Sequence, residues 1–136
     1  MTKWGELGLE EKIRTILAEV EQNAKLVDHH FNPPFITAYQ LAVLLEEKEA
    51  GIASKLGKQL GGKGTGEYHS VAQYVAKELS SRISKGEIED IEGAFLDVRD
   101  ISKLNFPKDI ESSANERLSL FRLKEVKPSN IQGLFL

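Results

Sequence analysis

Apolar residues recur at three- and four-residue steps through the first two thirds of the chain, which predicts four amphipathic helices. The first helix is expected from about residue 8 to about residue 27, because its apolar positions form one stripe. The stripe consists of Ile13, Ile16, Leu17, Val20, Ala24 and Val27. A second helix is expected over residues 37–49, a short third helix over residues 52–60, and a fourth over residues 70–85.

Local signals indicate where two of these helices begin. Thr37 followed by Gln40 predicts a capping box at the start of the second helix, in which each residue bonds the backbone N–H of the other. Ser70 followed by Gln73 predicts the same arrangement at the start of the fourth helix. Gly86 is expected to end the fourth helix, because glycine accepts the left-handed conformation common at helix ends.

The last third of the chain has a different pattern, which predicts two short strands. Residues 94–99 and 118–123 are rich in apolar side chains and are flanked by polar stretches. We expect them to pair as an antiparallel sheet, because an isolated strand cannot satisfy its backbone groups. A long polar loop over residues 102–116 would then join them. The apolar end of the chain is expected to dock on its own core or on a neighbouring subunit.

Together these elements predict one α+β domain, mostly α, that covers residues 1–136. It comprises a four-helix N-terminal part (residues 1–92), a small two-stranded antiparallel sheet in a β-hairpin-like part (residues 93–126) and an apolar C-terminal tail (residues 127–136). Helices followed by two strands with a long loop between them is a winged-helix-like order. No internal repeat stands out.

The composition of the chain excludes several classes of protein. The chain contains no cysteine, which excludes disulfides, thiolate chemistry and cysteine-ligated zinc, and fits a reducing compartment. No apolar run approaches the roughly 20 residues of a membrane helix, and the N-terminus lacks the apolar core of a signal peptide. We therefore expect a cytoplasmic protein without a membrane partner.

The charge is distributed unevenly along the chain. Residues 55–85 carry six basic and two acidic side chains, a balance of +4, whereas the rest of the chain carries −7 within a total of −3. A local reversal of sign indicates an anionic partner. A solvated helix face explains the same pattern equally well.

The fourth helix offers the clearest candidate surface for nucleic acid. Its polar residues recur at three- and four-residue steps, so we expect them to share one exposed side of the helix. Lysine and arginine would neutralise phosphates, and a glutamine could meet a base edge. Lysines of the preceding glycine-rich stretch would add phosphate contacts. The candidate nucleic-acid-binding residues are Lys58, Lys63, Gln73, Lys77, Ser81 and Arg82.

The glycine-rich stretch also approaches a nucleotide-binding motif. Gly57, Gly62 and Lys63 have the spacing of a P-loop, but Gly64 stands where serine or threonine should hold magnesium. A P-loop also follows a buried strand, and here a helical pattern precedes it. A flexible loop is the simpler interpretation, although its backbone N–H groups could still meet a phosphate.

Other chemistry is weakly indicated. His29 and His30 are adjacent, so they point in different directions, and His69 lies far along the chain; this spacing does not define a metal site. Ser70 follows His69 but lacks the strand and glycines of a nucleophile elbow. We expect no catalytic residues, no metal and no cofactor.

Two classes of function remain open. The first is a small non-catalytic binding protein, with DNA or RNA held by a winged-helix-like domain. The alternative is a protein-interaction or accessory subunit that forms oligomers through its apolar C-terminal tail, with no nucleic-acid ligand.

Overall fold

The computed structural model describes residues 2–25, 31–61, 70–102, 104–111 and 118–124. About half of these residues are helical, and the strands form small antiparallel sheets. The helices are α1 (Lys3–Glu6), α2 (Leu9–Ala24), α3 (Ala38–Lys48), α4 (Ile52–Leu56) and α5 (Val71–Ser84). The strands are β1 (Ile36–Thr37), β2 (Ile91–Leu96), β3 (Asn105–Phe106), β4 (Ile110–Glu111) and β5 (Leu118–Leu123).

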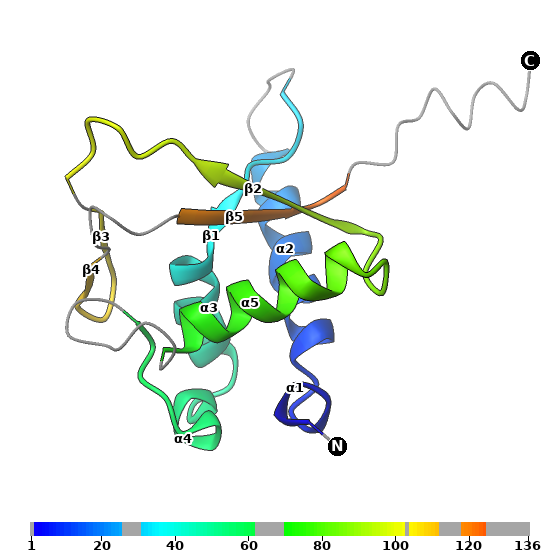
Figure 1. The fold of residues 1–136 in the computed structure, drawn as a ribbon, viewed down its shortest axis with the longest axis vertical. Coiled ribbons are helices and arrows are strands. Elements are labelled where there is room, and N and C mark those ends of the chain that lie inside the picture. The colour runs from blue at the N-terminus through cyan, green and yellow to red at the C-terminus, as the bar shows by residue number, and fades with distance from the viewer. Residues whose placement is uncertain (1, 26–30, 62–69, 103, 112–117, 125–136) are drawn as a thin grey trace, which may run out of the picture.

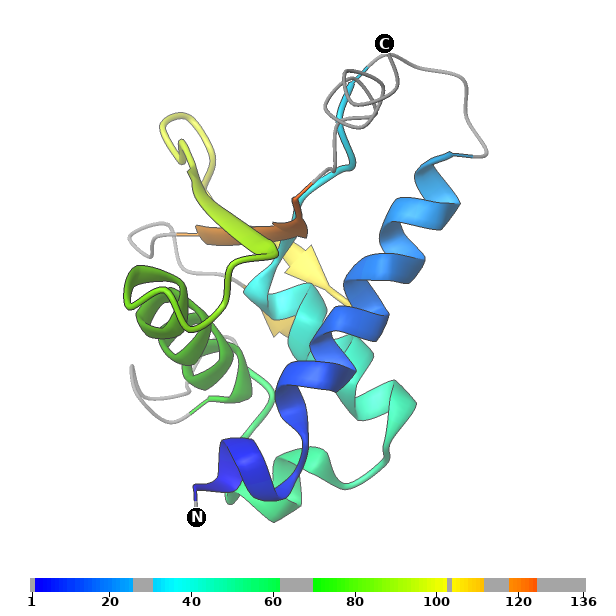
Figure 2. The ribbon, with the colours of Figure 1, turned by 90° about the vertical axis from the view of Figure 1, so that its right-hand side faces the viewer.

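The main sheet lies across one end of the helices, and α1 and α4 lie at the other end (Figure 1). Turned by 90°, α3 lies between α2 and α5 (Figure 2), and it packs against both. The core is built from the apolar sides of these three helices and from buried side chains of the sheet, among them Ile36, Ile91 and Phe121.

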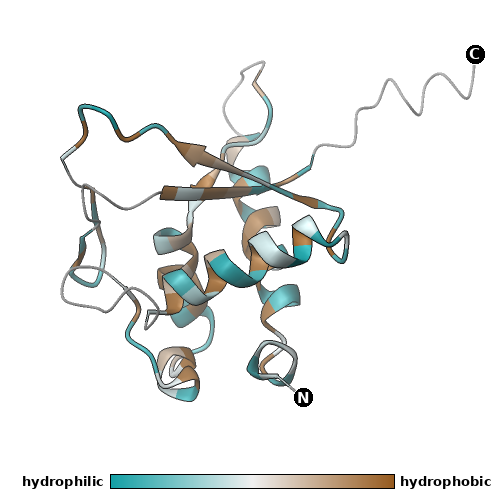
Figure 3. Cartoon of the chain, in the orientation of Figure 1, coloured by the Kyte–Doolittle hydropathy of each residue, from teal (hydrophilic) through white to brown (hydrophobic). Residues whose placement is uncertain are grey.

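The main sheet has three strands in the order β1-β5-β2, all antiparallel, so β5 is central. Ile36, Phe121 and Gly93 lie side by side across it. A Cβ atom on Gly93 would stand 3.2 Å from the Phe121 ring, so glycine leaves room for that ring beside β2. The ribbon is hydrophobic over much of β2 and β5 (Figure 3).

The predicted α+β class is confirmed, but several details of the prediction are wrong. The described residues form five helices rather than four, because Thr2 caps a short extra helix, α1. The main sheet has three strands rather than two, because Ile36–Thr37 pairs with β5 immediately before α3. Strand β2 begins at Ile91 instead of residue 94, whereas β5 spans the predicted residues. Helix α4 ends at Leu56 instead of residue 60.

The predicted start of α3 and the predicted cap and stop of α5 agree with the structure. The Thr37 side chain accepts a hydrogen bond from Gln40 N–H at 3.1 Å, and Thr37 N–H donates to Gln40 Oε1 at 2.7 Å. At α5, Ser70 Oγ accepts from Gln73 N–H at 3.0 Å, which is one of the two bonds of the predicted capping box. Gly86 adopts φ +78°, directly after the last turn of α5.

The segment between β2 and β5 is not the plain loop that the polar sequence predicted. Residues of β3 and β4 form a second, two-stranded sheet. Phe106 stacks on Tyr39 of α3 with ring centroids 5.2 Å apart, and Ile110 is buried. Part of this segment is therefore anchored on the helical core.

Candidate nucleic-acid interface

The outer side of α5 carries three of the predicted site residues. Gln73, Lys77 and Ser81 follow one another at four-residue steps, so they lie on one side of the helix, each about 40° round from the last. Lys77 is exposed, and the other two are half-buried. Among the residues that the structure describes, Lys77 has no carboxylate within ion-pair distance. Its charge is therefore available to a ligand.

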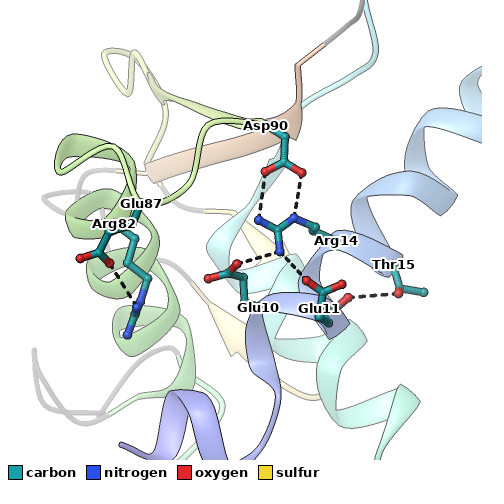
Figure 4. Close-up of polar contacts among 7 residues, drawn as sticks. All are labelled: Glu10, Glu11, Arg14, Thr15, Arg82, Glu87 and Asp90. Carbon is teal, nitrogen blue, oxygen red and sulfur yellow. Dashed lines mark hydrogen bonds and ion pairs between the residues drawn. The ribbon is translucent and has the colours of Figure 1, made fainter.

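Arg82 lies on a different side of α5, which corrects the prediction that it shares an exposed side with Lys77. The two are five residues apart, or roughly 140° round the helix. The Arg82 guanidinium stands 5.1 Å from the centre of the Trp4 ring. It also pairs with Glu78 at 3.5 Å and with Glu87 at 3.3 Å, as Figure 4 shows for the second. Only 24% of its side chain is exposed, so Arg82 serves packing.

Lys58 belongs to the same group of side chains as Arg82. Its ammonium lies 5.6 Å from the centre of the Tyr74 ring, and Tyr74 meets Trp4 edge to face at 6.2 Å. Burial, and after it the negative charge of Glu78, raises the pKa of the Tyr74 hydroxyl. We refer to Lys58, Tyr74, Trp4 and Arg82 as the Trp4 stack; it joins α1 to α5. Lys63, the remaining predicted contact, lies outside the described residues.

The N-terminus of α5 is closed by the chain itself. Val71 N–H donates to the Gln59 carbonyl at 2.7 Å, and Ala72 N–H donates to the Leu60 carbonyl at 3.0 Å. Ser70 takes the next N–H group, that of Gln73. The N–H groups that a phosphate would need there already have partners. The described part of the stretch that resembles a P-loop also follows helix α4 rather than a strand.

The segment that follows β2 carries a cation that the sequence analysis did not single out. Arg99 had been assigned to a strand, but β2 ends at Leu96, which places Arg99 in the connection. Its side chain is 86% exposed and pairs locally with Asp97 at 2.6 Å. The predicted loop over residues 102–116 contains two lysines. Lys108 is exposed, and Lys103 lies outside the described residues. Arg99 differs from Arg82 in its exposure and not in its residue type.

The acidic run of residues 87–92, which leads from the end of α5 into β2, binds arginines instead of simply facing water. Arg14 of α2 makes a two-pronged contact with Asp90, Nε to Oδ2 at 2.8 Å and Nη2 to Oδ1 at 3.0 Å. Arg14 also binds Glu10 and Glu11 (Figure 4). Hydrogen bonding to Arg14 lowers the pKa of Asp90.

A carboxylate also pairs with an arginine at each end of this run. Glu87 meets Arg82, and Glu92 accepts a hydrogen bond from Arg122 Nε at 2.6 Å. The carboxylates of Glu87, Asp90 and Glu92 therefore connect α5, α2 and β5. No carboxylate of this run pairs with Lys77 among the described residues, so none of them neutralises its charge there.

The other candidate chemistry gains no support. Among the described residues, no group of three or more histidine or acidic side chains is placed to hold a metal ion. His29, His30 and His69 lie outside them. No helix in the described ranges has both the length and the apolar character to span a membrane. Comparison of the chain with protein-family models, curated proteins and solved structures gives no match.

Proposed function

We propose that this chain is a small non-catalytic protein that binds nucleic acid, with α5 presented to a duplex in a winged-helix arrangement. The order of elements carries the proposal. A helix (α2) is followed by a strand (β1), two packed helices (α3 and α5, with the short α4 between them) and two strands (β2 and β5, with β3 and β4 between them). The strands β2 and β5 form a sheet with β1. This order is typical of winged helices, in which the second helix of the packed pair enters the groove.

The chemistry of α5 supports the same proposal. On its outer side, Lys77 would neutralise a phosphate, and the Gln73 amide would read a base edge. Ser81 can bond either group. Ser80 and Ser84 are exposed on the same side, and such short side chains allow a helix backbone to approach a groove closely. Arg99 would meet the backbone from the connection after β2. Lys58 and Arg82 are assigned to the Trp4 stack instead, and Lys63 stays a predicted contact.

The number of exposed cations limits the expected affinity. Each phosphate contact to B-DNA contributes a slope of about −0.9 in log K against log salt. Lys77, Arg99 and Lys63 would give roughly three such contacts, so the slope should be shallow, about −3. The net charge of −3 opposes non-specific association, which fits a ligand held at few points.

Fluorescence anisotropy with labelled duplex DNA between 50 and 200 mM salt tests the proposal. Lys77→Ala should weaken binding and reduce the slope by about 0.9. Lys25→Ala is the matched control, because it also removes one exposed lysine but lies at the end of α2, away from α5. Equal effects of the two variants, or no measurable binding at 50 mM salt, would contradict the proposal.

The alternative function, a protein-interaction or accessory subunit, rests on a different observation. Among the described residues, two large apolar side chains are exposed, Phe31 at 75% and Phe95 at 63%. Such side chains are common at protein interfaces. The apolar tail predicted to mediate oligomers lies outside the described residues. Light scattering across a concentration series decides this alternative: a dimer that dissociates in Phe31→Ser or Phe95→Ser supports it, and a concentration-independent monomer contradicts it.

A further inference from the structure

Strand β2 forms an apolar edge of the main sheet. In the part of the chain that the structure describes, the sheet ends at β2. Gly93, Ala94 and Phe95 are all exposed, and the Phe95 side chain is 63% exposed. The strand contains no proline, lysine or arginine, which are the residues that commonly protect an edge from added strands. An edge of this kind favours pairing with a further strand.

The end of the chain repeats the sequence of β2. Strand β2 reads Ile91-Glu92-Gly93-Ala94-Phe95-Leu96, and the last six residues read Ile131-Gln132-Gly133-Leu134-Phe135-Leu136. Isoleucine, glycine, phenylalanine and leucine recur at the same four positions. Six residues are too short for this repeat to stand out in the sequence until β2 is known to be an edge strand. A segment with the composition of β2 is therefore suited to a strand in the same sheet.

We propose that residues 131–136 add to the outer edge of β2 of their own chain, as a parallel strand in register. The point at which the chain leaves the sheet supports this. Lys124 N–H donates to the Asp90 carbonyl at 2.9 Å, which places the end of β5 beside the start of β2. The outer edge of β2 is two strand spacings from β5, or about 10 Å.

The length of the connection selects the direction. Residues 125–130 span at most about 20 Å when fully extended. They can therefore reach the Ile91 end of β2 from Lys124. The Leu96 end lies about 17 Å further along the strand, or about 20 Å from Lys124 in all, which only a fully extended connection would reach. A start of residue 131 beside Ile91 requires only about half of that span, and it makes the added strand parallel to β2.

The side chains match in this register. Phe135 would lie beside Phe95 on the same face and cover it, and Leu136 would lie beside Leu96. Position 132 would lie beside Glu92, whose carboxylate already accepts a hydrogen bond from Arg122 at 2.6 Å. A second glutamate there would bring two like charges together, and the chain has Gln132 instead, whose amide can donate to Glu92.

Engineered disulfides test the register, because the natural chain contains no cysteine. Ala94→Cys with Leu134→Cys places two thiols at neighbouring positions of a parallel pair, within the Cα separation of a disulfide. Leu96→Cys with Ile131→Cys is the matched control; an antiparallel strand would join these positions, and a parallel one keeps them far apart. Mild oxidation should close the first pair within one chain and leave the second open. Closure of the second pair alone, or of neither, overturns the proposal.

Hydrogen exchange tests the docking in the natural chain. Removal of residues 131–136 should raise the exchange rates of amides in β2 about tenfold or more and leave those of α3 unchanged. Unchanged β2 rates overturn the proposal. A full-length chain that doubles its mass in light scattering, and returns to a monomer on this truncation, would assign the strand to a second copy and overturn the intrachain placement. DNA binding that depends on Lys77 is a separate measurement.

Discussion

Two sides of α5 carry similar polar residues, but their surroundings differ. On one side, Arg82 packs on Trp4 and meets two carboxylates. On the outer side, Lys77 is exposed and has no ion pair among the described residues. A cation count along the chain treats these two residues as equal. Their angular positions on the helix show that one stabilises the fold and the other can serve a ligand.

The largest effect should come from the centre of the Trp4 stack. Trp4→Ala removes a buried indole that contacts both Tyr74 and Arg82, so we expect a loss of about 3–5 kcal/mol in the free energy of unfolding. Chemical denaturation measures this loss. Trp4→Phe keeps an aromatic ring and should cost clearly less. A loss below about 1 kcal/mol for Trp4→Ala would show that the stack is not part of the core.

Arg82→Ala should have an intermediate effect on stability. It removes a cation–π contact and two ion pairs from a side chain that is mostly buried, which we expect to cost about 1–2 kcal/mol. The salt dependence of DNA binding should keep its slope, because Arg82 is already engaged within the fold. A slope that falls as much as in Lys77→Ala would place Arg82 at the interface and remove the contrast between the two sides.

Acid should weaken the ion pair between Arg14 and Asp90. Hydrogen bonding to Arg14 lowers the pKa of Asp90 from its ordinary value of 3.8, so the charged carboxylate stabilises the folded state above about pH 4. That contribution is lost as the pH falls through the lowered pKa. Asp90 is 54% exposed, so the effect is about 0.5–1 kcal/mol. Thermal unfolding between pH 6 and pH 3 should show a smaller decrease in Asp90→Asn than in the natural chain.

The smallest change in stability should come from adding a cation to the outer side of α5. Ser81→Lys changes a half-buried position beside Lys77, so the free energy of unfolding should stay within about 0.5 kcal/mol. The slope of log K against log salt should become steeper by about 0.9. Lysine introduced at Thr15, on the exposed side of α2, is the control and should leave the slope unchanged.

Features encoded within a few residues could be predicted from the sequence. The capping box of Thr37 and Gln40 and the Ser70 cap each depend on residues three positions apart, so their signals are local. Strand β5 was recognisable because its six residues are rich in apolar side chains and are flanked by polar stretches. Strand β1 was missed because two residues carry no periodicity, and its existence depends on Phe121 and Leu120, more than eighty positions later.

The candidate site was predicted less well for the same physical reason. Spacing placed Gln73, Lys77 and Ser81 on one side of α5 correctly, but the five-residue step to Arg82 turns that side chain towards Trp4. The partners of the acidic run were also beyond sequence reasoning. Asp90 meets Arg14 from another helix, and Glu92 meets Arg122 from another strand. Such pairs follow from the packing of whole elements, which a single sequence does not show.

The carbonyls of Gln59 and Leu60, which accept hydrogen bonds from the first amides of α5, determine where the chain should tolerate insertions and deletions. Because Gln59 and Leu60 are joined to Val71 and Ala72, the ends of the intervening stretch are fixed to each other whatever lies between them. Doubling the length of a stretch whose ends are already joined costs only about 0.6 kcal/mol of chain entropy. Insertions and deletions between positions 61 and 69 should therefore be tolerated, and peptide tags could be placed there without moving α5.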